Sequence, residues 1–129
     1  MNHIIYSGLE KKCQDIVGWE KSRYSVISEM LLKAIDEVLN VTPNELKGRV
    51  RRREFVDARN MYCAIIRRTT HQTLTNIGAS IGRNHSTVIH SIESHKTKLE
   101  TDPAYLGAYT ELLETITNQI EAKNVKEEY

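Results

Sequence analysis

One stretch decides the fold of this chain: residues 73–90, which read TLTNIGASIGRNHSTVIH. Thr73 is a suitable N-cap for a short helix that runs to about Ile81, because its hydroxyl can accept from a free amide of the first turn. Gly82 and Arg83 then interrupt the helical pattern, and Asn84 is a suitable cap for a following helix. A short helix, a tight turn and a second helix together predict a helix-turn-helix.

Apolar residues on both sides of this stretch recur at helical spacing. Thr42-Pro43-Asn44-Glu45 predicts a helix start with a capping box, and Gly48 begins a loop over residues 48–53. No segment shows the convincing alternation that is typical of a strand. The predicted fold class is therefore all-α, a helical bundle with a helix-turn-helix. The longer helices are expected over residues 24–39, 54–68, 84–101 and 103–122.

The chain has 129 residues, 40% of them hydrophobic and 27% charged, which is the profile of one globular domain. We divide it into an N-terminal segment of unassigned role (1–21), a helix-turn-helix domain (22–122) and a polar tail (123–129) that frays. No apolar run suffices to span a bilayer, and the beginning of the chain lacks the pattern of a secretory signal. Cys13 and Cys63 are interpreted as reduced thiols, with Cys63 in the core, so a cytoplasmic location is expected; a single disulfide between them is the alternative.

The formal net charge of +1 conceals a basic centre. Residues 47–68 hold eight basic groups, seven of them Arg, against two acidic groups, whereas residues 99–129 hold two basic and seven acidic groups. A positive centre attracts polyanions, and the planar fork of Arg suits phosphate and guanine. A solvated helix face with local salt bridges is the alternative interpretation of the same pattern.

The second helix of the motif begins with polar side chains, Arg-Asn-His-Ser-Thr at residues 83–87. Each can donate or accept a hydrogen bond, and this end of a helix-turn-helix enters the major groove of DNA. The Arg-rich loop precedes the motif by one helix, on which Arg59 is expected near the exposed side. A flexible Arg suits the narrow, electronegative minor groove. The combination predicts binding to duplex DNA.

Two blocks of the sequence resemble a known family. Residues 41–61, VTPNELKGRVRRREFVDARNM, are similar to the basic loop and following helix of the C-terminal DNA-binding domain of the bacterial replication initiator DnaA. Residues 77–90, IGASIGRNHSTVIH, are similar to the family signature around the recognition helix. The likeness extends over about residues 24–116, with both blocks in the family's order. It implies a fold similar to the Trp-repressor type that binds a short duplex site.

The resemblance also implies roles for individual residues. One arginine matches the position that the family places in the minor groove, and four signature residues match those that face bases in the major groove. Three further arginines match positions near the backbone or bases, and two residues at the first motif helix match positions set against phosphate. The minor-groove position is Arg51, and the base-facing signature residues are Asn84, His85, Ser86 and Thr87. The three further arginines are Arg49, Arg53 and Arg59, and the residues set against phosphate are Thr73 and Leu74. Arg83 and His90 complete the predicted DNA-binding set, with His90 either a phosphate contact or a packed residue.

The chain departs from the family pattern in the turn and in one base-facing residue. The family commonly has two glycines before the basic residue, where this chain has only Gly82, and it favours Asp at the position of Asn84. A carboxylate accepts from cytosine N4 whereas an Asn amide pairs with adenine, so we expect a target other than the family's usual box. No Gly-x-x-x-x-Gly-Lys-Ser/Thr loop is present, so no bound nucleotide, no cofactor and no catalytic activity are predicted.

Several other residues could carry chemistry on their own. His85, His90 and His95 are spaced by five, which places neighbours about 140° apart on a helix and predicts no shared metal ion. We expect His95 at the surface. Trp19, the only tryptophan of the chain, is interpreted as a packing anchor for the N-terminal segment.

We expect a role in the regulation of DNA replication or transcription at a bacterial or phage nucleoid, with a mobile element as one setting. One rival is a protein-interaction module, in which the apolar stripe of the acidic last helix joins a second copy or a protein partner; alternatively that stripe covers the core. A second rival is RNA binding through the Arg-rich loop, which lacks paired aromatic residues. No membrane partner is predicted. The stripe consists of Tyr105, Tyr109, Leu112, Leu113 and Ile116.

Overall fold

A computed structural model describes residues 24–70 and 72–127, and within these ranges the chain forms helices and no strand. The all-α prediction is confirmed. The N-terminal segment, with Cys13 and Trp19, lies outside the described residues. The helices are α2 (Tyr24–Leu39), α3 (Pro43–Lys47), α4 (Arg53–Thr70), α5 (Leu74–Ser80), α6 (His85–Thr101) and α7 (Pro103–Glu127).

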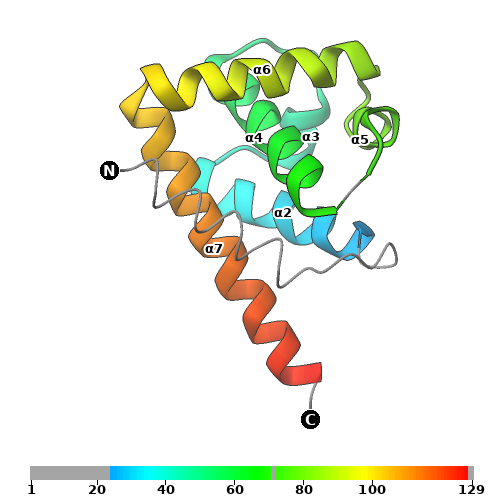
Figure 1. Ribbon diagram of the computed structural model, residues 1–129, viewed down its shortest axis with the longest axis vertical. Coiled ribbons are helices and arrows are strands. Elements are labelled where there is room, and N and C mark those ends of the chain that lie inside the picture. Colours follow the sequence, from blue (N-terminus) through cyan, green and yellow to red (C-terminus); the bar gives the residue numbers. More distant parts are fainter. Residues whose placement is uncertain (1–23, 71, 128–129) are drawn as a thin grey trace.

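Helix α4 is the centre of the molecule, with α2, α3, α5 and α6 packed around it (Figure 1). Most of its side chains are buried, including the whole predicted apolar face. The hydroxyl of Tyr62 on this helix lies 2.7 Å from that of Ser28 on α2 and 3.0 Å from that of Ser80 on α5, so one buried phenol links three helices. Cys63 is fully buried as predicted. The predicted face consists of Phe55, Ala58, Tyr62, Ile65 and Ile66.

Helix α6 lies across one end of the molecule, and α7 turns away from it and runs back along α2 (Figure 1). The apolar stripe of α7, on which the protein-interaction alternative was based, is buried in the core. Each of its five side chains is at most 3% exposed. The alternative that this stripe covers the core is therefore confirmed, and it presents no free face to a partner. The helix also continues to Glu127, beyond the predicted end at residue 122.

The helix starts follow the predicted caps. Thr42 and Glu45 form a reciprocal capping box, with the Thr42 amide 3.0 Å from the Glu45 carboxylate and the Glu45 amide 3.2 Å from the Thr42 hydroxyl. Thr73 accepts from the amide of Asn76, and Asn84 accepts from that of Thr87. Local hydrogen bonds of this kind fix where each helix begins.

The helix-turn-helix closes through a tight approach of two backbone segments. The amide of Arg83 donates to the carbonyl of Gly78 at 2.8 Å. A Cβ atom on Gly78 would lie 2.3 Å from the carbonyl oxygen of Arg83, so only glycine fits at this position. Gly82 has φ of +68°, the left-handed conformation that reverses the chain between the two helices. The single glycine of the turn thus performs the reversal.

None of the helices over residues 24–70 and 72–127 combines the length and the apolar character that a membrane span requires.

Candidate nucleic-acid interface

The basic loop, residues 48–52, and the beginning of α6 face each other across a groove of about 780 Å³. The groove therefore brings together the cationic and the polar stretches that the sequence singled out, although they are some thirty residues apart. Its lining includes eight of the predicted DNA-binding residues. These eight are Arg49, Arg51, Arg59, Arg83, Asn84, Ser86, Thr87 and His90.

Arg59 is buried, with 7% of its surface exposed, so the prediction that it lies near the exposed side of its helix is wrong. Its Nε donates to the carbonyl of Leu46 at 2.6 Å, and its Nη2 donates to the carbonyls of Gly48 at 2.8 Å and Val50 at 3.0 Å. Burial, and then the nearby charge of Arg83, lower the pKa of Arg59. These hydrogen bonds compensate the buried cation and use the donors that a DNA contact would need.

Arg83 also donates to backbone carbonyls. Its Nη2 donates to the Gly48 carbonyl, and its Nη1 lies 3.2 Å from the Lys47 carbonyl. Further contacts of Nη1 reach the carbonyls of Ile81 and Gly82 in its own turn. The side chain thus spans from the turn before α6 to the beginning of the basic loop.

Most of the carbonyls that the two arginines bind belong to a very short helix and to the loop that follows it. Helix α3 has five residues, so most of its carbonyls have no partner within the helix. Arg59 and Arg83 together bind every carbonyl from residue 45 to residue 50 except that of Arg49. Because carbonyls carry no net charge, the site keeps the full positive charge of both side chains.

Arg49 and Arg51 are exposed side chains of the basic loop that line the groove. Within residues 24–70 and 72–127 neither forms a hydrogen bond or an ion pair. Val50 between them is 57% exposed. Arg52 has its guanidinium carbon 5.9 Å from the centre of the Phe55 ring and does not line the groove. The loop therefore presents two cations with unused donors.

The beginning of α6 presents polar groups to the solvent. His85, Ser86 and Thr87 are exposed, and so is His90, which excludes the packed alternative for that residue. The Oδ1 atom of Asn84 accepts from the Thr87 amide at 2.9 Å, so the cap uses one of the two atoms that a bidentate pair with adenine requires. The amide nitrogen of Asn84 remains available as a donor.

The groove also contains three polar residues that the sequence interpretation missed, Asn60, Ser91 and Ser94. Ser91 and Ser94 follow Thr87 by four and seven residues, so helical spacing from Thr87 was a usable signal. No such signal in the sequence pointed to Asn60, because it lies in the apolar centre of α4. Its amide nitrogen is buried and has no hydrogen-bond partner among the described residues.

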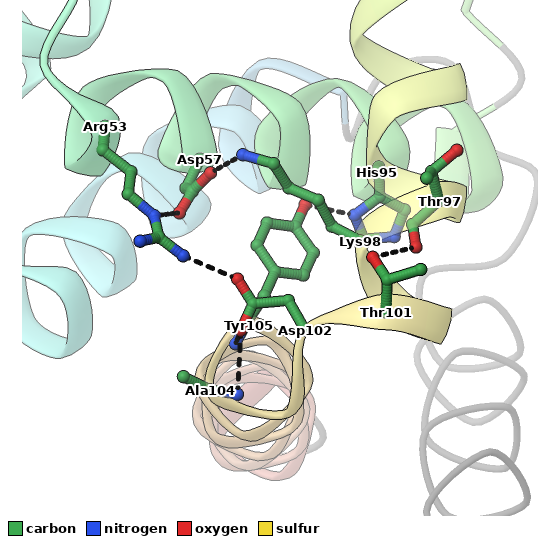
Figure 2. A network of polar contacts seen from close by, with 9 residues as sticks. All are labelled: Arg53, Asp57, His95, Thr97, Lys98, Thr101, Asp102, Ala104 and Tyr105. Atoms are coloured by element: carbon green, nitrogen blue, oxygen red, sulfur yellow. Dashed lines mark hydrogen bonds and ion pairs between the residues drawn. The ribbon is translucent and has the colours of Figure 1, made fainter.

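Four predicted residues do not line the groove, and these are His85, Arg53, Thr73 and Leu74. Arg53 is at the opposite side of the α4 start, where its Nη2 donates to the Asp102 carboxylate at 2.8 Å, beside the ion pair of Asp57 and Lys98 (Figure 2). This pairing occupies one of its donors, and a contact of Arg53 with DNA remains a prediction. Thr73 caps α5, and Leu74 packs partly against the core, so a phosphate contact at this helix start remains a prediction.

His95 is buried, with 4% of its surface exposed, so its predicted surface position is wrong. Its Nδ1 lies 2.5 Å from the Tyr105 hydroxyl, and its ring meets the Tyr109 ring edge to face at 4.4 Å (Figure 2 shows the contact with Tyr105). Burial, and then the charges of Arg68 and Lys96, lower the pKa of His95 to about 4. The side chain is therefore a neutral core residue at pH 7.

The histidines and the cysteine considered above form neither a metal cluster nor an activated thiol among the described residues. No cluster of three or more metal-ligating side chains occurs in this part of the chain. Burial raises the pKa of Cys63 to about 12, which leaves its thiol protonated and a poor nucleophile.

Comparison with known proteins identifies relatives of this arrangement. A family model described as the bacterial dnaA protein helix-turn-helix matches residues 28–94. The chain is 34% identical over 82 residues to chromosomal replication initiator protein DnaA 2 of Chlamydia pneumoniae, covering 64% of this chain and 18% of that protein. It is 30% identical over 98 residues to chromosomal replication initiator protein DnaA of Deinococcus radiodurans, covering 76% of this chain and 20% of that protein. The chain thus spans about a fifth of the length of these relatives.

Proposed function

The chain belongs to the bacterial DnaA helix-turn-helix family, and from this membership we propose that it binds duplex DNA through the groove between the basic loop and α6. Membership implies DNA binding in replication initiation. The matched region is a DNA-binding module rather than a catalytic one. One observation carries the proposal: unpaired arginines and an exposed polar helix start line the same groove.

In the proposed complex, the basic loop enters the minor groove. Arg51 inserts there, where the negative potential of an A·T-rich tract attracts a guanidinium, and Arg49 contacts the adjacent backbone. The exposed Val50 between them packs against sugar carbons. The proposal draws on the unused donors of both arginines, since a cation already paired with a carboxylate would have to give up that partner.

The beginning of α6 enters the adjacent major groove in this proposal. His85 and Ser86 donate to or accept from base edges, and the Thr87 methyl is suited to a thymine methyl. Asn84 contributes only its amide donor, because its oxygen caps the helix. The free amides and the dipole of the α6 N-terminus favour a phosphate nearby. Most of the base discrimination then falls to His85 and Ser86, and His90 faces the backbone.

The proposed DNA-binding unit is residues 22–122, and we propose that it acts at the nucleoid in the control of replication or transcription. The test is selection of preferred duplexes from a random pool, followed by affinity measurements at several salt concentrations. Neutralisation of about six phosphates predicts a slope near −5 for log affinity against log salt. Affinity that does not change between low and physiological salt, or no preferred duplex in the selected pool, would contradict the proposal.

His85→Ala provides the internal control for the division of roles. This change should abolish discrimination at one or two base pairs and leave affinity for random duplex nearly intact, because His85 is assigned to base edges rather than to phosphates. Competition with duplex RNA of the same length tests the nucleic-acid class. Equal competition by RNA would show that neither the major-groove contact nor the minor-groove arginine contributes to recognition.

A further inference from the structure

Two arginines from different elements meet on one backbone oxygen, the carbonyl of Gly48. Arg59 reaches it from within α4, and Arg83 reaches it from the turn before α6, across 35 residues of sequence. Gly48 is the first residue of the basic loop. A Cβ atom at this position would lie 3.1 Å from the carbonyl oxygen of Asn44, so the backbone is closely packed where the two arginines converge.

The two guanidinium groups connect the backbone around Gly48 to two different helices. Arg59 fixes the loop to α4 through Leu46, Gly48 and Val50, and Arg83 fixes the same backbone to the beginning of α6. Each uses the planar fork of its side chain to bind more than one carbonyl. A lysine ammonium has no such fork and acts as a single compact charge.

We propose that Arg83 and Arg59 are positioning residues that hold the basic loop and the start of α6 as one unit, so that recognition in the minor groove and in the major groove is energetically coupled. This inference rests on the proposed DNA-binding function. It assigns to Arg83 an effect on base pairs that Arg83 does not contact, because its donors are directed at Lys47 and Gly48.

The physical basis is the entropy of ordering the loop. When the loop is held before binding, Arg51 is already positioned and little conformational entropy is lost in the complex. When the loop is released, the same arginine must be ordered on the DNA. The loss of conformational entropy then lowers the affinity for the preferred duplex. Random duplex binds through diffuse phosphate attraction, which depends on charge and hardly on loop position.

The test replaces the fork and keeps the charge, with Arg83→Lys as the variant and Arg52→Lys as its matched control. Arg52 lies in the same loop, but its guanidinium stacks on Phe55 and donates to none of the shared carbonyls. The probes are a preferred duplex, its single base-pair variants and a random duplex. The base pairs recognised by the loop are defined as those at which Arg51→Ala abolishes the preference.

We expect Arg83→Lys to lower the preference at the base pairs recognised by the loop roughly tenfold, because charge-assisted hydrogen bonds to the loop are lost. Its affinity for random duplex should stay close to that of the unaltered chain, and Arg52→Lys should keep the full preference. An equal loss on random and preferred duplex would overturn the inference, since it would make Arg83 a phosphate contact only.

Amide hydrogen exchange of the free protein supplies a readout that needs no DNA. In Arg83→Lys, the amide of Gly48, which donates to the Glu45 carbonyl at 3.3 Å, should exchange faster while the urea midpoint stays near that of Arg52→Lys. Unchanged exchange together with unchanged DNA preference would overturn the positioning role and leave the DNA-binding function standing. Failure of the unaltered chain to bind any duplex would instead overturn the proposed function, and with it the coupling in DNA recognition.

Discussion

The two ends of α6 hold their cations in opposite ways. At its N-terminal end, Arg59 and Arg83 donate to backbone carbonyls, and Arg49 and Arg51 stay unpaired. At its C-terminal end, carboxylates and not carbonyls accept from the cations, in the network of Figure 2. There Arg53 pairs with Asp102, and Lys98 pairs with Asp57. Both arrangements fix long side chains, but only the second cancels their charge.

This difference explains how a chain with a net charge of +1 can present a cationic groove. Carbonyl oxygens satisfy the donors of a guanidinium and leave its charge, whereas carboxylates satisfy the donors and neutralise it. The positive potential is therefore concentrated at the start of α6, next to the side chains proposed to contact bases. The C-terminal end of α6 is the structural junction with α7.

The largest expected effect comes from the turn that delivers Arg83 to the loop. Gly78→Ala places a Cβ atom 2.3 Å from a backbone oxygen, and relief of this clash requires a shift of the turn. We expect a loss of about 3 kcal/mol in the free energy of unfolding, measured by urea denaturation. The matched control is Gly107→Ala, which meets nothing within 4 Å in α7 and should be slightly stabilising. Equal stabilities of the two variants would contradict the close approach.

Acid should destabilise the junction of α6 with α7 through His95. The unfolded side chain has its ordinary pKa near 6.5, and the folded one has a pKa of about 4, so the unfolded chain binds the proton more tightly. The stabilisation is fully present above pH 6.5 and is lost as the pH falls toward 4. Between pH 7.5 and pH 5 the free energy of unfolding should fall by about 2 kcal/mol from this residue.

Urea denaturation of the unaltered chain and of His95→Gln, at a series of pH values, checks this expectation. The variant will be less stable at pH 7.5 because it disturbs a packed site, but its stability should change little between pH 7.5 and pH 5. A decline equally steep in both proteins would assign the acid sensitivity to another group.

The contrast between the two ends of α6 predicts unequal effects of two nearby arginines on DNA binding. Arg51→Ala should lower affinity for the preferred duplex by roughly tenfold and reduce the salt slope by about one, because an unpaired cation is lost. Arg53→Ala should change both quantities much less, since its charge is already paired with Asp102. Measurement of salt-dependent affinity for both variants tests the contrast, and equal losses would refute it.

The smallest expected effects are on stability at the C-terminal end of α6. The Arg53 side chain is 73% exposed, so removal of its ion pair by Arg53→Ala should cost at most about 0.5 kcal/mol. Asp102→Ala should cost about 1 kcal/mol, because the Asp102 carboxylate also accepts from the amides of Ala104 and Tyr105 at the start of α7. Urea denaturation at pH 7 compares the two. A larger loss in Arg53→Ala would show that the ion pair, and not the cap, holds the junction.

The sequence by itself determined the helices, their starts and the helix-turn-helix. Thr42, Thr73 and Asn84 each cap through an amide three residues away, so the information lies within one helical turn. The apolar faces of α4 and α7 could also be predicted from the sequence, because helical spacing alone groups those residues on one side. The basic loop and the polar start of α6 could also be identified as chemical features.

Only the tertiary structure decided what each cation does. Arg83 meets its carbonyl 35 residues away, and Arg53 meets its carboxylate 49 residues away, so neither partner is encoded by local spacing. The same holds for His95, which is buried because the first turns of α7 lie against the end of α6 and supply Tyr105 and Tyr109. Local hydrogen bonds and periodicity act within a helix, whereas the partner of a long charged side chain is set by the packing of helices that are remote in sequence.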